Sequence, residues 1–327
     1  MRNKTVILSA SIIALLSAVF VALTSGENGC TVSELLSADT YDPASTQYKI
    51  LTHIRLPRIL MAVSVGGLLA FSGLIMQNIF RNPLVEPYTM GLSGGAVVGV
   101  ALMFISGLAY TVGSAAITAG ALIGALATMV IILALYRTML RDTTKMLLSG
   151  IMISIATSAL TTLIMSFCTH ENLSQIIAWT MGSFDNASLG QAMLMTIVAA
   201  MAMAASMFMG NILNIISLGE QQAQHVGLNV RRAVPILFTI ATLIAAASVA
   251  AAGIIAFTGM IIPHVARIVV GYDNRVVGPL SVILGATFMI LCDTIAHNIV
   301  YPRELPVGVI SGILGSVLFI YLALRKK

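Results

Sequence analysis

Two ionisable side chains in a long apolar stretch near the C-terminus could together carry a proton. Asp293 and His297 are four residues apart, so in a helix they share one face. Polar groups retained inside an apolar segment are candidates for function. The alternative is that Asp293 bonds nearby backbone or a hydroxyl close to the outer surface. The apolar segments hold fewer ionisable groups than a proton-coupled carrier normally needs, which counts against that function.

The chain has no motif for bond-making chemistry of its own. It contains no GxxxxGK[ST] nucleotide loop, no HExxH metalloprotease motif and no GxSxG hydrolase motif. We therefore predict a non-catalytic chain that binds no cofactor and no metal; if ATP supplies energy, ATP and Mg²⁺ bind a separate subunit. Cys30, Cys168 and Cys292 have no metal-ligand spacing, and whether Cys30 pairs with Cys168 stays open.

The composition places these residues in a membrane. Apolar residues make up 58% of the chain and charged residues 9%, against about 25% charged in a soluble domain. Runs between charges repeatedly reach the roughly 20 residues that cross a hydrocarbon core. We predict an all-α, polytopic transmembrane helical bundle that forms a single domain over residues 1–327. The ten predicted spans lie near residues 5–24, 58–80, 91–108, 113–136, 146–167, 190–210, 233–252, 254–271, 279–297 and 306–324.

The Lys and Arg positions predict the orientation, because cytoplasmic loops are enriched in them. With ten spans and a cytoplasmic N-terminus, 13 of the 17 basic residues fall inside; the four outside are Lys49, Arg55, Arg58 and Arg303. Both termini are thus predicted to be cytoplasmic, in a multi-pass inner-membrane protein surrounded by lipid, with external segments at 25–54 and 168–189. The first span is predicted to be an uncleaved anchor. The net charge of +5 is a topological signal and gives no reason to expect nucleic-acid binding.

Two segments break the apolar pattern. Residues 81–87 are polar and hold two prolines, and irregular backbone at membrane depth needs protein or water as its partner. Residues 211–232 are too polar to span and too apolar for a free tail. In this cytoplasmic segment Leu218-Gly219-Glu220 opens a helix-compatible stretch that Gly227 closes. A short amphipathic helix there is suited to docking on a partner; a solvated linker is the alternative.

Glycine spacing and an internal likeness predict tight packing. The pairs Gly95/Gly99, Gly120/Gly124 and Gly308/Gly312 are each four residues apart, which lets helix backbones approach closely. Residues 67–81 align without gaps with residues 253–267, with six of fifteen positions identical. Transporters are often built from repeats, with the pathway at the repeat interface. Convergence of two glycine- and alanine-rich helices is the alternative.

Several motifs, taken together, point to one family. They are Arg55-Leu56-Pro57-Arg58, Gly73-x-x-x-Gln77, Asn82-Pro83-Leu84, Gly91-x-Ser93-x-Gly95-Ala96, Trp179-x-Met181-Gly182-Ser183-Phe184, Leu218-Gly219-Glu220 to Gly227-Leu228, Gly259-x-x-x-Pro263-His264-x-x-Arg267, Asp273-x-Arg275 and Glu304-Leu305-Pro306-x-Gly308. The chain resembles the FecCD/BtuC-type permease subunits of type II ABC importers, which take up iron–siderophores, haem and cobalamin. The resemblance covers nearly the whole chain after about residue 50.

The resemblance implies three groups of site residues. Docking of a binding protein is expected of Arg55 and Arg58, because exposed guanidiniums pair well with carboxylates. Some members carry a third docking arginine where this chain has His297, and Arg303 nearby is expected to replace it. The residues expected to couple to the ATPase are Asn214, Leu218, Gly219, Glu220, Gln224, Gly227 and Leu228. The residues expected at the pathway and its cytoplasmic gate are Gln77, Asn82, Leu84, Thr143 and Thr144, with Asp142 a departure from the small hydroxyls of the family's gate.

The resemblance also implies the partners and the mechanism. Two copies of the chain are expected to form a homodimer around a central pathway, with two cytoplasmic ATPase subunits and a periplasmic or lipid-anchored substrate-binding protein. Transport would occur by alternating access. Family frequency puts a ferric siderophore first as the substrate, then cobalamin, then haem. The alternative function is a proton-coupled secondary transporter that uses Asp293 and His297.

Overall fold

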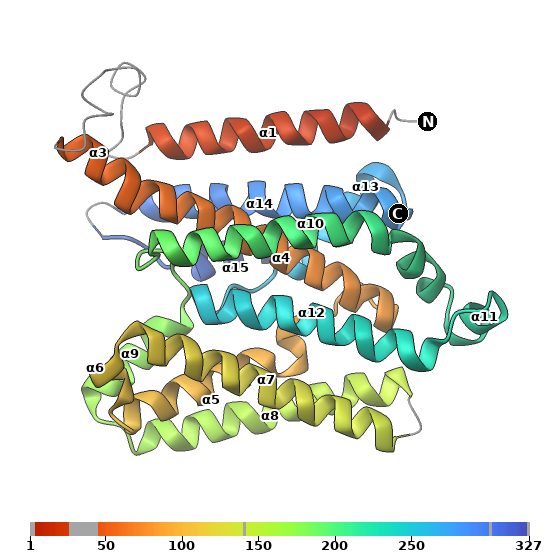
Figure 1. The fold of residues 1–327 in the computed structure, drawn as a ribbon, viewed down its shortest axis with the longest axis horizontal. Coiled ribbons are helices and arrows are strands. Elements are labelled where there is room, and N and C mark those ends of the chain that lie inside the picture. The colour runs from red at the N-terminus through yellow and green to blue at the C-terminus, as the bar shows by residue number, and fades with distance from the viewer. Residues whose placement is uncertain (1–3, 26–44, 140–141, 301–302, 326–327) are drawn as a thin grey trace.

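The computed structural model describes residues 4–25, 45–139, 142–300 and 303–325, and all regular structure in these ranges is helical (Figure 1). In chain order the elements are α1 (Lys4–Thr24), α3 (Thr46–Ile50), the π-helical η2 (Leu51–Arg55), α4 (Leu56–Phe80), the 3₁₀ turn η3 (Pro87–Met90), α5 (Leu92–Ile105), α6 (Leu108–Val112), α7 (Ser114–Thr138), α8 (Thr143–Ser166), α9 (His170–Thr180), α10 (Leu189–Ser217), α11 (Glu220–His225), α12 (Val230–Ala252), α13 (Thr258–Val270), α14 (Asn274–Asn298) and α15 (Val307–Arg325).

Each predicted span falls on one of these helices. In the described ranges, seven helices are long and apolar enough to cross a membrane: α1, the continuous helix Thr46–Phe80, α7, α8, α10, α12 and α14. Three shorter apolar helices, α5, α13 and α15, occupy the other predicted spans. Residues 46–54 of the predicted external segment are helical and continue directly into α4, so the prediction that they lie outside the membrane stays a prediction.

The bundle has two distinct ends (Figure 1). Helix α11 and both chain termini lie at one end, which we call the α11 end, and α3, α6 and α9 lie at the opposite end, the α9 end. Helix α4 runs through the middle and is buried on nearly every side by α10, α12, α13 and α14. Its polar residues are satisfied inside the bundle; Ser72, for example, donates to the Ala241 carbonyl at 2.6 Å.

Glycine allows the closest helix contacts, as predicted for two of the three pairs. A Cβ at Gly99 would lie 1.9 Å from the Gly120 carbonyl oxygen, and one at Gly124 would lie 2.0 Å from that of Gly95. Helices α5 and α7 therefore touch backbone to backbone. Gly308 is also tightly packed, against the Met181 and Ile254 carbonyls, whereas Gly312 has no atom within 4 Å, so a packing role for Gly312 is wrong within one chain.

The internal sequence likeness corresponds to a physical contact. Gly73 of α4 and Gly259 of α13 occupy equivalent positions in the two segments, and a Cβ at Gly73 would lie 1.9 Å from the Gly259 carbonyl oxygen. The two segments differ at their starts, because residues 67–71 are helical while residues 253–257 are not. Gly253, at φ 75°, ends α12 against the Trp179 carbonyl, and α13 begins only at Thr258.

The proline-containing segment after α4 folds back against the bundle. Arg81 ends α4 in the left-handed conformation, at φ 49°. The Asn82 side chain then accepts from the Leu84 backbone N–H at 3.0 Å, and Gly91 lies against the middle of α8, next to Ser154. Glu86 and Tyr88 are buried, and the Tyr88 hydroxyl accepts from the Ile255 backbone at 3.4 Å. Protein groups thus satisfy this irregular backbone, as expected at membrane depth.

Asp142, a departure from the family's gate, caps a helix. Its Oδ1 accepts from the backbone N–H groups of Thr144 at 2.8 Å and Lys145 at 3.2 Å at the start of α8. We expect Asp142→Ala to destabilise the chain by about 1 kcal/mol because two N-terminal amides lose their acceptor. Thermal unfolding in detergent measures this loss. Asp142→Asn keeps the acceptor and should match the wild type within experimental error; equal stability of the alanine variant would refute the cap.

Candidate functional site

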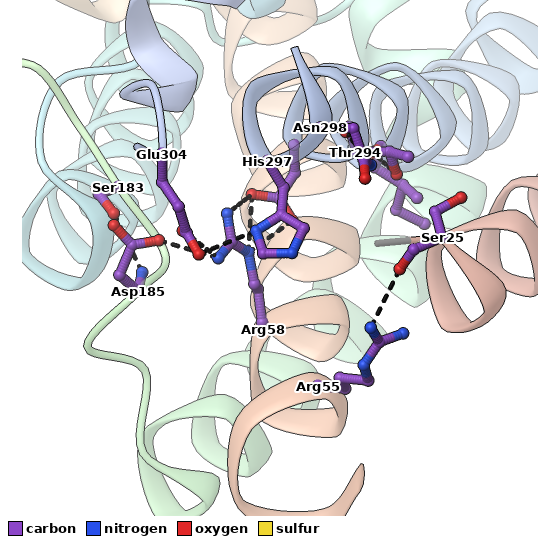
Figure 2. Close-up of polar contacts among 11 residues, drawn as sticks. Ser25, Arg55, Arg58, Ser183, Asp185, Thr294, His297, Asn298 and Glu304 are labelled. Atoms are coloured by element: carbon purple, nitrogen blue, oxygen red, sulfur yellow. Dashed lines mark hydrogen bonds and ion pairs between the residues drawn. The ribbon is translucent and has the colours of Figure 1, made fainter. Parts of the chain in front are cut away.

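An ion-pair cluster at the α9 end is centred on Arg58, in the first turn of α4 (Figure 2). The guanidinium holds both carboxylate oxygens of Asp293 on α14, with Nε–Oδ2 and Nη2–Oδ1 distances of 2.9 Å each. Its Nη1 lies 2.6 Å from Glu304 Oε2 and 3.0 Å from Asp185 Oδ1. Arg58 therefore joins α4, α14 and two loops, the one between α9 and α10 and the one before α15.

The predicted exposure of the docking arginines is wrong. The Arg58 side chain is only 13% exposed. Arg55 is buried, and its guanidinium donates to the backbone carbonyls of Leu23 and Ser25, at the end of α1. The last carbonyl groups of a helix have no N–H donor within that helix. Arg55 supplies N–H donors at the end of α1. Arg55 ties α1 to the start of α4.

His297 belongs to the same cluster but does not pair directly with Asp293. Its Nδ1 lies 2.8 Å from Glu304 Oε1, which is an ion-pair distance without hydrogen-bond geometry. Asp293 instead faces Arg58. Because Arg58 bonds both carboxylate oxygens, it favours the ionised form of Asp293. This arrangement does not support a proton relay between Asp293 and His297.

Three of the four predicted docking residues line one cavity. Arg55, Arg58 and His297 surround a space of about 240 Å³ together with Asp293 and Glu304. Arg303 is exposed on the neighbouring loop. The cavity is therefore lined by both cationic and anionic groups, and a polar side chain of a partner could enter it.

The two loop carboxylates of the cluster have opposite pKa shifts. Burial raises the pKa of Asp185, and the nearby Glu304 carboxylate adds to the rise, although Ser183 and Arg58 oppose it. Burial also opposes ionisation of Glu304, but hydrogen bonds from Arg58 and Asp185 outweigh it, so the pKa of Glu304 lies below its usual range. Glu304 is thus the firmer ionic partner of Arg58 on the loops.

At the α11 end, the predicted short helix is confirmed. Helix α11 begins at Glu220, after Gly219 at φ 103°, and Gly227 follows it at φ 91°. Gln221, Gln222, Gln224, His225 and Val226 are exposed, whereas Ala223 is fully buried. The predicted cytoplasmic segment 211–232 also contains the end of α10, up to Ser217, and the start of α12, from Val230.

The inner face of α11 adjoins Thr143, which is predicted for the gate, and Arg81 at the end of α4. Arg81, Thr143, Glu220 and Ala223 line a small shared cavity of about 10 Å³. A Cβ at Gly219 would lie 2.9 Å from Arg81 Nη1, so the end of α4 rests on the start of the α11 segment. Nearby, Leu84 is 49% exposed and Thr144 is exposed, as residues of an open surface would be. The α11 segment therefore adjoins the end of α4 and the start of α8.

Comparison with known proteins identifies the family. The sequence model of the FecCD transport family matches residues 13–325. The chain belongs to the FecCD transport family.

Relatives of this FecCD-family chain are similar over nearly their whole length. HmuU of Yersinia pestis, a hemin transport system permease protein, is 34% identical over 316 residues, covering 94% of this chain and 93% of HmuU. BtuC of Vibrio cholerae, a vitamin B12 import system permease protein, is 33% identical over 285 residues, covering 86% and 85%. A solved inward-facing ABC transporter, assigned to the metal-chelate type, has 27% identity and a TM-score of 0.87, covering 98% of this chain and 99% of that one.

Two predicted site residues of the FecCD-family chain are bonded to neighbouring helices. Gln77 is buried, and its Nε2 donates to the Gly259 and Met260 carbonyls while its Oε1 accepts from Arg267. Gln77 therefore braces α13, and its role in the pathway stays a prediction. Asn214, predicted for ATPase coupling, donates to Asp273 at 3.0 Å and accepts from the Asn274 backbone at 2.8 Å, so it fixes the start of α14.

Sequence reasoning missed Asp185 and Arg81 as parts of the two sites. Asp185 comes directly after the motif that runs from Trp179 to Phe184. An acid predicted to lie outside the membrane, like Arg55 and Arg58, was the available signal for an ion pair. Arg81 ends the segment that repeats at residues 253–267, and its contact with Gly219 depends on a fold-back that no local pattern shows. Cys30 lies outside the described residues, so whether it pairs with Cys168 stays open. Within the described ranges, no three His, Cys, Asp or Glu side chains are grouped so that they could hold a metal ion.

The Asp273 carboxylate joins three helices at the α11 end, α1, α10 and α14. It accepts from Arg275 at 3.0 Å, Asn214 at 3.0 Å and Lys4 at 3.4 Å, and these hydrogen bonds, Arg275 first, hold its pKa well below the usual range. A lowered folded-state pKa stabilises the fold above the unfolded-state value of about 4, and the effect is lost as the pH falls through the folded-state value.

We therefore expect Asp273→Asn to cost about 1 kcal/mol or less at neutral pH, because the group is partly solvated. Asparagine can still accept from the Arg275 backbone N–H, so the substitution removes the charge and keeps the helix cap. Thermal unfolding of both proteins across the acidic range measures the difference. It should shrink below about pH 4; a difference that grew towards acid would contradict the sign of the shift.

Proposed function

We propose that this chain is the membrane permease subunit of a type II ABC importer for a metal chelate. Membership of the FecCD family and the full-length likeness to HmuU, BtuC and a metal-chelate-type transporter support this function. The chain would pass its substrate from a binding protein to the cytoplasm by alternating access. On family frequency a ferric siderophore is the first candidate, then cobalamin, then haem.

The position of the short helix α11 beside the ends of α4 and α8 is the observation that supports the proposal most directly. An exposed short helix rests through Arg81 and Ala223 on the ends of α4 and α8, where the gate residues stand. Such a helix can receive the motion of a separate ATPase and transmit it to a gate, which fits a chain without a nucleotide motif of its own. The α11 end is therefore proposed to be cytoplasmic, together with both termini, in an inner-membrane protein of ten spans and one transmembrane domain.

A homodimer is proposed from the uncovered surface of α8. Each copy of the chain would then bind one ATPase subunit. Only 6% of the most apolar stretch of this helix is buried within one chain, although it carries exposed hydroxyl side chains, including Ser158 and Thr162. Hydroxyl-bearing helices associate through interhelical hydrogen bonds in lipid. A second copy packed along α8 would use these groups and enclose a pathway between the chains.

Docking of the binding protein is proposed at the α9 end. The cavity lined by Arg55, Arg58 and His297 opens there beside the exposed Arg303. Arg303 remains our candidate for the docking arginine that His297 replaces. Unchanged affinity for the binding protein after Arg303→Glu would refute that assignment.

Two measurements test the proposed function. Co-purification should recover the chain with an ATPase and, in the presence of substrate, with a binding protein; recovery of the chain alone would contradict it. Titration of that binding protein with ferric siderophore, cobalamin and haem then identifies the substrate. A proton-coupled carrier using Asp293 and His297 is the alternative, and the ion pair between Arg58 and Asp293 counts against it.

A further inference from the structure

Arg58 faces more carboxylates than one guanidinium can neutralise. Asp293 takes Nε and Nη2, while Glu304 and Asp185 share Nη1 at 2.6 Å and 3.0 Å (Figure 2). The three acids also differ in exposure: the side chain of Asp293 is 9% exposed, that of Glu304 35% and that of Asp185 46%. Asp293 is therefore a fixed partner, whereas water and other ions can compete for the positions of Glu304 and Asp185.

The two exposed acids hold two loops that border a larger cavity at the α9 end. Asp185 lies between α9 and α10, and Glu304 lies three residues before α15. Both line a cavity of about 370 Å³, together with Trp179 at the end of α9. The Gly308 backbone N–H, at the start of α15, also donates to the Gly182 carbonyl at 3.5 Å. The loop after α9 therefore contacts α15 as well as Arg58.

We propose that Arg58, Glu304 and Asp185 form an exchangeable ion-pair latch, in which a carboxylate of the docking partner replaces Glu304 and Asp185 on Arg58 and so releases both loops. This inference rests on the proposed function for the identity of the partner. Asp293 stays bound and keeps the guanidinium in place during the exchange. The loop residues around Glu304 and Asp185 then lose their attachment to Arg58, and the outer end of the chain opens.

The cluster has the features that such an exchange requires. The incoming carboxylate has a cavity of about 240 Å³ to enter, lined by Arg55, Arg58 and His297. Glu304 and Asp185 share the single Nη1 of Arg58, so neither forms the bidentate pair that holds Asp293. A bidentate guanidinium–carboxylate pair with Asp293 positions Arg58 even when Nη1 is vacant.

The only tryptophan of the chain, Trp179, reports on the latch without any partner. In the full-length chain in lipid nanodiscs, we expect Asp185→Asn combined with Glu304→Gln to raise acrylamide quenching of Trp179 fluorescence about twofold, because released loops open the cavity to solvent. Glu171→Gln, which removes an exposed acid of α9 outside the cluster, is the matched control and should leave quenching unchanged. Equal quenching of the double variant and the wild type would overturn the latch.

A second measurement tests the exchange itself. We expect Glu304→Gln to bind the purified cognate binding protein about fivefold more tightly, because the internal competitor is weakened, and Arg58→Gln to bind it about tenfold more weakly. Wild-type affinity in Glu304→Gln would overturn the exchange. If the wild-type chain binds no such protein, the proposed function fails at this end, while the Trp179 measurement still decides whether the latch exists.

Discussion

Replacing Gly73 by alanine is expected to destabilise the chain by about 3 kcal/mol or more, the upper part of the range for overpacked cores. The new Cβ would lie 1.9 Å from the Gly259 carbonyl oxygen and 2.5 Å from its carbonyl carbon. Both obstacles are backbone atoms, so no side chain can turn aside to make room. The central helix α4 and the half-length helix α13 would have to separate, and the buried contacts around them would be lost.

Thermal unfolding in detergent, with the yield of monodisperse protein, measures this effect. Gly312→Ala is the matched control, because Gly312 also lies in a helix but has no atom within 4 Å. That substitution should be neutral or stabilise the chain by up to about 1 kcal/mol through helix propensity. An unchanged unfolding midpoint for Gly73→Ala would mean that α4 and α13 do not meet backbone to backbone.

Replacing Ala223 by leucine is expected to reduce substrate uptake about tenfold while the chain remains folded. Ala223 is the fully buried residue of α11, and the adjoining cavity of about 10 Å³ cannot hold the added carbon atoms. The larger side chain would lift α11 away from Arg81 and Thr143, which line the same cavity. The exposed surface of α11 would be unchanged, so the ATPase would still bind but its motion would not reach the gate.

Uptake into proteoliposomes and ATPase co-purification separate these two effects. Ala223→Ser adds little volume and should retain uptake within about twofold of the wild type. Loss of uptake together with loss of ATPase binding would show that the substitution damages the docking surface. Full uptake in the leucine variant would contradict transmission through the contact between α11 and the ends of α4 and α8.

The sequence predicts the helices well because long apolar runs leave few alternatives in lipid. Every predicted span falls on a helix of the described chain, and Gly219 and Gly227 correctly mark the ends of the short helix α11. Boundaries shift where polar residues find partners far away in sequence. Helix α10 extends to Ser217, past Asn214, because that side chain bonds Asp273 and Asn274 at the start of α14.

Site geometry is less predictable, since it depends on contacts between distant segments. The motif around Arg55 and Arg58 suggested two exposed docking groups, but Asp293 and Glu304 lie more than 230 residues away and bury Arg58 in an ion-pair cluster. Gln77 was predicted to lie at the pathway, but no local pattern indicates that its side chain is buried and bonded to α13. Asp142 departs from the family pattern for a local reason, the cap of α8, which the sequence alone does not distinguish from a change in the gate.

The central claim, that a separate ATPase drives this FecCD-family chain, is tested most directly by uptake into proteoliposomes that contain the permease, its ATPase and its binding protein. We predict that uptake of the chelate requires ATP inside, stops when the ATPase is inactivated by substitution, and continues at the same rate with a protonophore present. Uptake that persists with the inactive ATPase and collapses with the protonophore would contradict the claim and favour a proton-coupled carrier.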